Sequence, residues 1–348
     1  MKNKKSKGPA RPVNVAVVGL GFMGITHIKA YRQIPEARLV AVCDAVRLPV
    51  NGVLPGVTGN ISGSEALDLG RNVRVYQKLE DLLADGEVEL VDLCVPTPLH
   101  PQQAIASLRT GKHVVCEKPL ARTSALAREI VSAAKAANGF FLPAMCMRFW
   151  PGWAWLKELV DNQTYGKVLT ARFRRVSAAP GWSQASYFKG GDSGGALLDL
   201  HIHDTDFVQF LFGRPRSVYS TGLSRFSGAI DHVVTQYQVA NGATVHAEGS
   251  WLLTQGFNMS YTMIFERATI DFDSARGADA LRVDEPERPS RTIKGDGSDG
   301  YTGELRHMVD AILGGKPPTI VTAQDGLSAV EICEAEEESV LTGRVVAV

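Results

Sequence analysis

Two different patterns of hydrophobic and polar positions divide the chain near residue 145. Before that point, short charge-free runs rich in β-branched residues alternate with amphipathic segments, as in residues 13–18 followed by 25–33. Runs of this kind are typical of parallel strands buried on both faces, and their alternation with helices predicts a doubly wound α/β sheet. The other predicted elements of this part are strands at 38–43, 88–95 and 112–116 and a helix at 101–110.

After residue 145 the alternation stops, and short strand-like runs follow one another with turn signals between them. Asn241-Gly242 is a strong hairpin signal. This pattern predicts an α+β domain with a mainly antiparallel, open sheet. The expected strands are 169–177, 216–220, 232–239, 244–253, 260–266 and 269–272, and helices are expected at 302–313 and 323–341. The expected organisation is a tail at 1–12, a nucleotide-binding domain at 13–145, and a domain for substrate binding and oligomerisation at 146–348, whose C-terminal helix is free to pack back on the first domain.

A glycine-rich turn follows the first predicted strand. Gly19, Gly21 and Gly24 form a GxGxxG motif between a strand and a helix, which is the context of the dinucleotide-binding Rossmann fingerprint. Gly19 permits the tight turn, Gly21 lets the backbone approach a pyrophosphate, and Gly24 lets helix and strand pack closely. The intervening Phe22 and Met23 belong to the same predicted cofactor site.

The second predicted strand ends at Asp44, 20 residues after Gly24. A carboxylate at this place accepts hydrogen bonds from the adenosine ribose and repels a 2′-phosphate, so the motif favours NAD. Arg47 keeps NADP open as an alternative because its guanidinium is able to reach a phosphate. The glycine- and proline-containing segment 48–72 looks like an insertion, and we assign it no chemistry.

Two polar clusters follow later strands of the parallel sheet, at residues 96–100 and 117–119. Ligands of open α/β sheets bind at the carboxyl ends of strands, where both clusters are expected. Lys118 is able to donate a hydrogen bond to a reacting oxygen there and to stabilise charge that develops on it. An ordinary surface lysine in a turn is an equally good interpretation of the sequence.

The segment 194–207 is dense in acidic residues and histidines. If it is helical, Asp199 and His203 lie four apart on one face, and a carboxylate beside an imidazole makes a general-base pair. A metal cluster of His201, His203, Asp204 and Asp206 is less favoured because alternating residues point to opposite sides of a helix, so no metal is expected. A helix cap and a core histidine remain the plain structural alternative.

Composition narrows the function classes. The 348 residues include 37 basic and 37 acidic side chains, which gives no electrostatic reason to expect nucleic acid or an anionic membrane as partner. Five scattered cysteines without a CxxC pair predict reduced thiols in a cytoplasmic protein. The basic N-terminal residues are interpreted as a solvated tail, since no hydrophobic signal segment follows them.

Taken in order, these motifs resemble the Gfo/Idh/MocA family, named after glucose-fructose oxidoreductase, inositol dehydrogenase and a rhizopine-catabolism protein. The resemblance extends from residue 13 to the end of the chain. It is carried by the GxGxxG motif, Thr97-Pro98-x-x-His100, Gly111-Lys-His-Val-Val-Cys-Glu117-Lys118-Pro119, Arg148-Phe149, Gly194-Gly195 with Asp199-x-x-x-His203, and Thr342-Gly343-Arg344-Val345.

The resemblance implies hydride transfer between a sugar or cyclitol hydroxyl carbon and a nicotinamide. Lys118, Asp199 and His203 would form the proton-transfer and substrate-binding set. Arg148, at the domain junction, would contact substrate or support the structure. The resemblance also implies a homodimer or homotetramer formed through the open sheet of the second domain. The nicotinamide would be lined by Thr97, Pro98, His100 and Glu117.

The sequence leaves the substrate open. Trp182 and Tyr187, just before the glycines that lead to Asp199, offer flat apolar faces for a sugar ring. His201 and the segment 48–72 depart from the family pattern. Besides a dehydrogenase, two other functions fit the family: a glycosidase that oxidises its sugar transiently, and a catalytically silent sensor of sugar and NAD.

Overall fold

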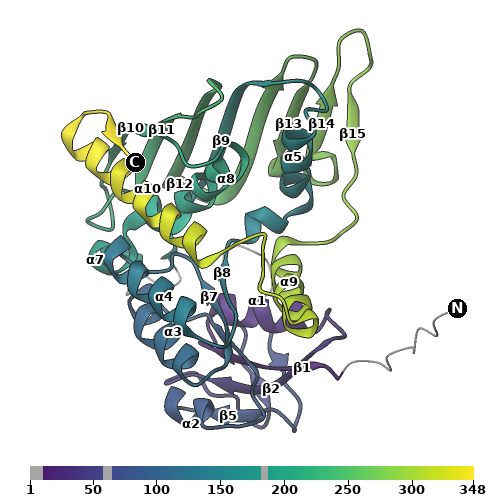
Figure 1. The fold of residues 1–348 in the computed structure, drawn as a ribbon, viewed down its shortest axis with the longest axis vertical. Coiled ribbons are helices and arrows are strands. Elements are labelled where there is room, and N and C mark those ends of the chain that lie inside the picture. Colours follow the sequence, from purple (N-terminus) through teal and green to yellow (C-terminus); the bar gives the residue numbers. More distant parts are fainter. Residues whose placement is uncertain (1–10, 58–64, 182–186) are drawn as a thin grey trace, which may run out of the picture.

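The protein folds into two sheet-containing parts, seen one above the other in Figure 1. The computed structural model describes residues 11–57, 65–181 and 187–348. The N-terminal part holds a six-stranded sheet in the order β5-β2-β1-β6-β7-β8, and every neighbouring pair in it is parallel. Its strands are β1 (Val13–Val18), β2 (Ala37–Cys43), β5 (Arg74–Tyr76), β6 (Leu90–Leu93), β7 (His113–Glu117) and β8 (Phe141–Ala144). The predicted doubly wound α/β part is therefore confirmed.

The helices of this part flank the sheet (Figure 1). They are α1 (Phe22–Tyr31), α2 (Leu79–Leu83), α3 (His100–Arg109) and α4 (Ser124–Ala136). The first helix begins at Phe22, three residues before the predicted start, because the glycine turn occupies only Gly19 to Gly21. In the predicted insertion, β3 (Val53–Leu54) and β4 (Leu67–Asp68) pair as a small separate ribbon.

The C-terminal part is built on an eight-stranded, mainly antiparallel sheet, as predicted. Asn241-Gly242 forms the turn between the third and fourth of these strands in sequence, and Gly242 has a φ of +77°. The predicted strands at 244–253 and 260–266 are one long strand, β12. Its two halves both pair with β9, so that Arg172 is opposite His246 and Thr262. The strands are β9 (Val168–Ala178), β10 (Ser217–Leu223), β11 (His232–Gln238), β12 (Thr244–Phe265), β13 (Thr269–Asp273), β14 (Leu281–Asp284), β15 (Arg291–Ile293) and β16 (Val346–Ala347).

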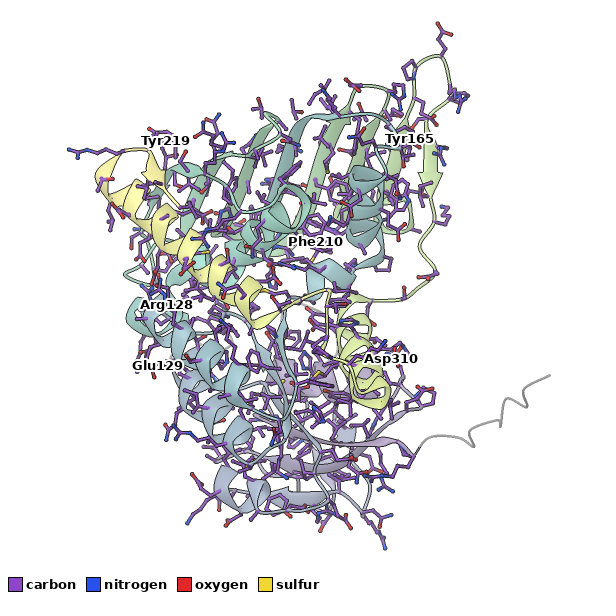
Figure 2. The ribbon with its side chains drawn as sticks, viewed as in Figure 1. Arg128, Glu129, Tyr165, Phe210, Tyr219 and Asp310 are labelled. Carbon is purple, nitrogen blue, oxygen red and sulfur yellow. The ribbon has the colours of Figure 1, made fainter. Side chains whose placement is uncertain are left out.

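In the described part of the chain, helices cover one face of this sheet and leave the other face open (Figure 1). They are α5 (Pro151–Asp161), α8 (Ile202–Phe212) and α10 (Ala323–Thr342), with the short α7 (Gly190–Ser193) nearby. Trp153 of α5 is completely buried, with its ring centroid 4.9 Å from that of Phe207 and 5.0 Å from that of Tyr261. On the other face Tyr219 is exposed (Figure 2). The interface between copies of the chain on that face stays a prediction.

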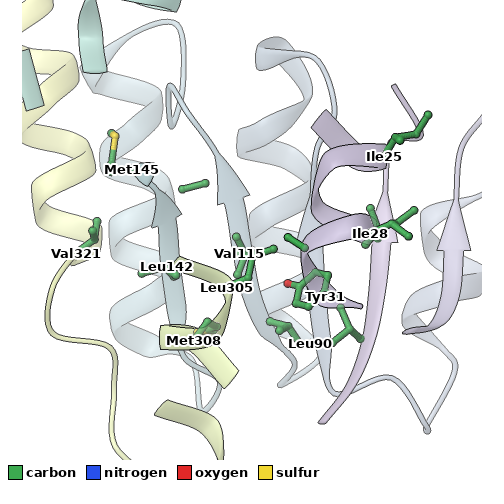
Figure 3. Packing of buried hydrophobic residues seen from close by; sticks show 14 of the residues in the cluster. Ile25, Ile28, Tyr31, Leu90, Val115, Leu142, Met145, Leu305, Met308 and Val321 are labelled. Carbon is green, nitrogen blue, oxygen red and sulfur yellow. The ribbon is translucent and has the colours of Figure 1, made fainter. Parts of the chain in front are cut away.

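The last two helices connect the parts. Leu305 and Met308 of α9 (Gly300–Gly314) lie in the same buried cluster as Val115 and Leu142 of the parallel sheet (Figure 3). An ion pair joins α10 to α4. A guanidinium nitrogen of Arg128, labelled in Figure 2, lies 2.7 Å from a carboxylate oxygen of Glu331. No helix in the described part of the chain combines the length and apolar character needed to cross a lipid bilayer.

Candidate active site

The three glycines of the first turn have three different surroundings. Gly19 has a φ of +88°, and a Cβ atom there would lie 2.5 Å from the carbonyl oxygen of Cys94. A Cβ at Gly24 would lie 1.9 Å from the Gly19 oxygen, whereas a Cβ at Gly21 would meet nothing within 4 Å. Gly19 and Gly24 are thus required by the fold. Gly21, at the N-terminus of α1, leaves its backbone open to approach, which fits the phosphates of a dinucleotide.

Asp44, at the end of β2, faces the same turn. One carboxylate oxygen accepts a hydrogen bond from the Leu20 backbone N–H at 2.7 Å. The other accepts from the backbone N–H groups of Val46 at 2.9 Å and Arg47 at 2.8 Å. The guanidinium of Arg47 donates to the carbonyl oxygen of Pro55 at 2.7 Å. The carboxylate is therefore held beside the glycine turn, and Arg47 is bound to the segment that follows it.

Lys118 follows β7 and joins the two parts of the molecule. Its Nζ donates to the backbone carbonyl of Asp199 at 2.6 Å and to the carboxylate of Asp199 at 3.0 Å. Both side chains retain some exposure, 13% for Lys118 and 21% for Asp199. Burial lowers the pKa of Lys118, but the carboxylates of Asp199 and Glu117 raise it more, so its pKa lies above the ordinary value. The amine is a cation held at the domain junction.

The segment that carries Asp199 is not a regular α-helix. Residues Leu197–His201 form a π-helix, and α8 begins only at Ile202. The i→i+5 hydrogen bonds of a π-helix change the angular spacing of side chains, and such turns are frequent at functional sites. Asp199 accordingly pairs with Lys118, and within the described residues no hydrogen bond joins it to His203. The expected direct pairing of Asp199 with His203 is replaced by an ion pair across the domain junction.

His203 lies partly buried on the first turn of α8. Its Nδ1 is enclosed and has no hydrogen-bond partner among the described residues. Burial, the Lys118 cation and the Arg175 cation together lower the pKa of His203 well below the ordinary value. The ring is neutral at physiological pH and is able to accept a proton.

This neutral state predicts the acidic limb of the pH–rate profile. A general base works only when deprotonated, so turnover should rise with pH through the pKa of His203 and then level off. We expect the midpoint of kcat/KM below 6.5, the ordinary histidine value. The limb should disappear from the residual activity of His203→Ala. A midpoint above the ordinary value in the unmodified protein would contradict this assignment of the base.

Two other predicted cofactor residues are held within the protein. His100 is buried, and its ring nitrogens lie 2.7 Å from the Pro119 carbonyl and 2.8 Å from the Val95 carbonyl. We therefore expect His100 to hold two strand ends in place rather than to touch the nicotinamide. Glu117 is also buried, and its carboxylate accepts a hydrogen bond from the Lys118 backbone N–H at 3.0 Å. The predicted cofactor residues with more exposure are Phe22, Met23, Thr97 and Pro98.

Arg148 does not have a free guanidinium. It forms two hydrogen bonds with the carboxylate of Asp206, at 2.9 and 2.6 Å, and a third with the carbonyl of Ile320 at 2.9 Å. Its guanidinium carbon lies 4.7 Å from the ring centroid of Phe210, which Figure 2 labels on α8. Since the side chain is only 3% exposed, this arrangement favours the structural alternative, and contact with substrate stays a prediction.

The residues of the less favoured metal alternative in this segment have separate partners. Asp204 pairs with Arg175, with two contacts of 3.1 and 3.2 Å, and Asp206 pairs with Arg148. The Nε2 of His201 lies 3.1 Å from the Tyr237 hydroxyl in the core. His201 is therefore buried among partners of its own, Tyr237 and Glu336.

Of the two aromatic candidates, Tyr187 lies near the site. The Asp199 carboxylate, together with burial, raises the pKa of its phenol. Its ring packs edge-on against Trp251 with the centroids 5.9 Å apart. Trp182 lies outside the described residues.

Sequence reasoning missed Arg175 and His27. Arg175 is buried on β9 and lowers the pKa of His203. His27 is buried on α1 among three carboxylates, those of Asp92, Glu117 and Glu304. Arg175 stands beside another arginine, Arg174, so the sequence offers no signal that it is the buried one, and His27 is marked only by its apolar neighbours Ile25 and Ile28.

Comparison with known proteins identifies the family of the chain. Residues 13–144 match the model described as the oxidoreductase family with an NAD-binding Rossmann fold, and residues 153–271 match the Gfo/Idh/MocA C-terminal domain. The chain is 26% identical to myo-inositol 2-dehydrogenase of Thermotoga maritima, over 94% of this chain and 96% of the relative. It is 27% identical to inositol 2-dehydrogenase of Rhizobium meliloti, over 97% and 99%.

Among solved structures, levoglucosan dehydrogenase in complex with NADH and L-sorbose is similar with a TM-score of 0.83. The alignment is 23% identical and covers 97% of this chain and 99% of that one, which shows the shared fold. The two family models together span well over half of the chain. The protein is therefore a member of the Gfo/Idh/MocA family, an oxidoreductase with an NAD-binding Rossmann domain.

Proposed function

We propose that the protein oxidises a hydroxyl group of a sugar or cyclitol to a carbonyl, with NAD as the hydride acceptor. The observation that carries the proposal is the contact between the Lys118 ammonium and Asp199, made across the domain junction and next to a neutral His203. The inositol and levoglucosan dehydrogenases named above support the class of substrate.

The protein's own groups have distinct roles in this reaction. Lys118 Nζ donates a hydrogen bond to the reacting oxygen and stabilises its developing negative charge. Asp199 orients the ammonium from the opposite domain, and its carboxylate is able to accept a hydrogen bond from a substrate hydroxyl. His203 takes the hydroxyl proton on Nε2, because Nδ1 is enclosed by protein. When bound, NAD supplies a nicotinamide C4 that accepts the hydride.

The proposed preference for NAD over NADP rests on Asp44. Its carboxylate is held beside the glycine turn by three backbone N–H groups, and Arg47 is bound to Pro55 rather than free for a phosphate. A carboxylate in this position accepts hydrogen bonds from the ribose hydroxyls and repels a 2′-phosphate.

Asp44→Asn should therefore reduce this preference. A hydrogen bond to a charged group contributes about 1.5–3 kcal/mol, so we expect the Kd of NADH to rise about tenfold or more while the Kd of NADPH falls. Titration of NADH and NADPH fluorescence measures both constants. Asp81→Asn, on an exposed turn of α2, is the matched control and should change neither. An unchanged ratio of the two constants in Asp44→Asn would refute the role of this carboxylate.

The proposed function is tested by following the absorbance of reduced nicotinamide with purified protein. NAD and NADP are each supplied with cyclitols, aldoses, deoxy sugars and aryl glycosides. Net NADH formation with a sugar or cyclitol supports the proposal. Release of an aglycone without net formation of NADH would instead identify a glycosidase that oxidises its sugar transiently. Binding of sugar without either reaction would replace it by a sensor.

A further inference from the structure

A buried histidine lies on α1 behind the site just described. His27 is completely enclosed, although it comes three residues after Gly24 of the glycine turn. Its Nδ1 lies 2.8 Å from the carboxylate of Asp92 on β6 and 3.3 Å from the sulfur of Cys94. Its Nε2 lies 3.2 Å from the carboxylate of Glu117 on β7 and 3.8 Å from that of Glu304 on α9. Four elements of the molecule therefore meet at one imidazole.

The charges around this ring favour an imidazolium. Burial lowers the pKa of His27, but Asp92 and Cys94 together raise it more, and the net pKa is well above the ordinary value. Burial raises the pKa of Glu117, and hydrogen bonding and attraction to His27 lower it more. Burial raises the pKa of Glu304 well above the ordinary value, and its two oxygens have no hydrogen-bond partner among the described residues. Tyr31 and Tyr301 also face the cluster.

The cluster is connected to Lys118 through Glu117. One oxygen of Glu117 faces His27, and the other accepts a hydrogen bond from the Lys118 backbone N–H at 3.0 Å. That peptide group sets the point from which the Lys118 side chain extends toward Asp199. A cationic His27 holds Glu117 ionised and in one orientation, because a buried carboxylate needs a charged or hydrogen-bonding partner.

We infer that His27 is a positioning residue for the reaction, which holds Glu117 in the orientation that places Lys118 against the substrate oxygen. The inference rests on the proposed function, since it assigns a task to Lys118. It also gives a reason for a histidine on the buried, mostly apolar face of α1.

A metal site is the competing interpretation of the same residues. The donor atoms of His27, Asp92 and Cys94 lie close enough together to be considered for one ion. However, the 2.8 Å between His27 Nδ1 and Asp92 is the length of a hydrogen bond. Two ligands on a tetrahedral zinc with bonds of about 2.0–2.1 Å lie roughly 3.3 Å apart. The geometry therefore favours an ion pair.

The first test measures the ring itself in the protein without cofactor. Long-range proton–nitrogen NMR spectra identify the His27 signals by their absence in His27→Gln. We expect a doubly protonated ring at a pH above 6.5, the ordinary pKa of histidine. A neutral ring at that pH would overturn the inference. Metal bound in stoichiometric amount by the unmodified protein, and lost in His27→Gln, would also overturn it.

The second test measures steady-state kinetics. A small displacement of a catalytic group lowers the rate of the chemical step on the order of 10²-fold. His27→Gln should therefore lower kcat by about this factor. KM and the Kd of NADH should change little, because the variant leaves the groups that bind both in place. His246→Gln, a histidine on the outer strand face of the second domain, is the matched control and should have normal kcat. Normal kcat in His27→Gln would overturn the inference.

A double-mutant cycle separates positioning from general loss of structure. If His27 acts through Glu117, the double variant with Glu117→Gln should be no slower than Glu117→Gln alone. Additive losses, or a loss of kcat equal to the unfolded fraction seen by thermal melting, would overturn the inference. If the unmodified protein turns over no sugar or cyclitol, the proposed function fails by itself, and the NMR measurement still decides the charge of His27.

Discussion

Lys118→Ala is expected to lower kcat on the order of 10²–10⁴-fold while the Kd of NADH stays nearly unchanged. Among the described residues, only the Lys118 ammonium donates hydrogen bonds across the junction to both the backbone carbonyl and the carboxylate of Asp199. Its hydrogen bond to the reacting oxygen strengthens as that oxygen gains charge, so the loss falls on the transition state. Stopped-flow or steady-state absorbance of NADH gives kcat, and fluorescence titration gives the Kd.

A surface lysine provides the control for this experiment. Lys135→Ala removes the same charge from an exposed position in the last turn of α4 and should leave kcat unchanged. Lys118→Arg keeps the charge but changes its geometry, and we expect it to recover only a part of the activity. Turnover by Lys118→Ala within a few-fold of the unmodified protein would show that the lysine has no part in the chemistry.

Arg148→Met is expected to lower the free energy of unfolding by about 3–5 kcal/mol. The substitution leaves Asp206 as an unpaired charge, and the structure gives that carboxylate an exposure of only 1%. It also leaves the Ile320 carbonyl without its 2.9 Å donor. Denaturant unfolding followed by circular dichroism measures the loss, with KM determined under conditions where the variant remains folded.

Two further variants make this result specific. Arg148→Met combined with Asp206→Leu replaces both charges by apolar groups and should recover much of the stability, because no buried charge remains unpaired. Arg128→Met breaks the exposed pair with Glu331 on α10 and should cost at most about 1 kcal/mol. Normal stability of Arg148→Met together with a raised KM would restore the predicted substrate contact.

The fold was predictable where the pattern of residues is local. Residues 13–18 form β1 as expected, because a charge-free β-branched run suits a strand buried on both faces. Asn241-Gly242 forms its hairpin because Gly242 adopts a positive φ that other residues disfavour. The continuity of the long strand β12 was harder to predict. The turn signals near residues 254–259 indicated two strands, yet β9 pairs with both sides of this bend and keeps β12 unbroken.

The residues of the candidate site were named from the sequence, but their partners were not. Lys118 and Asp199 are 81 positions apart, and no periodicity relates them. The π-helix at Leu197–His201 also could not be read from spacing, because it depends on how the segment packs between the two parts.

The sequence by itself therefore determined the parallel sheet, the glycine turn with Asp44, and the identity of Lys118, Asp199 and His203 as candidates. These features follow from strand periodicity, backbone freedom at glycine and side-chain chemistry, which are properties of neighbouring residues. Only the tertiary structure decided that Arg148 is bound to Asp206, that His201 belongs to the core, and that His27 lies among three carboxylates. The burial and pairing of a charged group depend on segments far away in the chain, and these determine whether it binds a ligand or supports the fold.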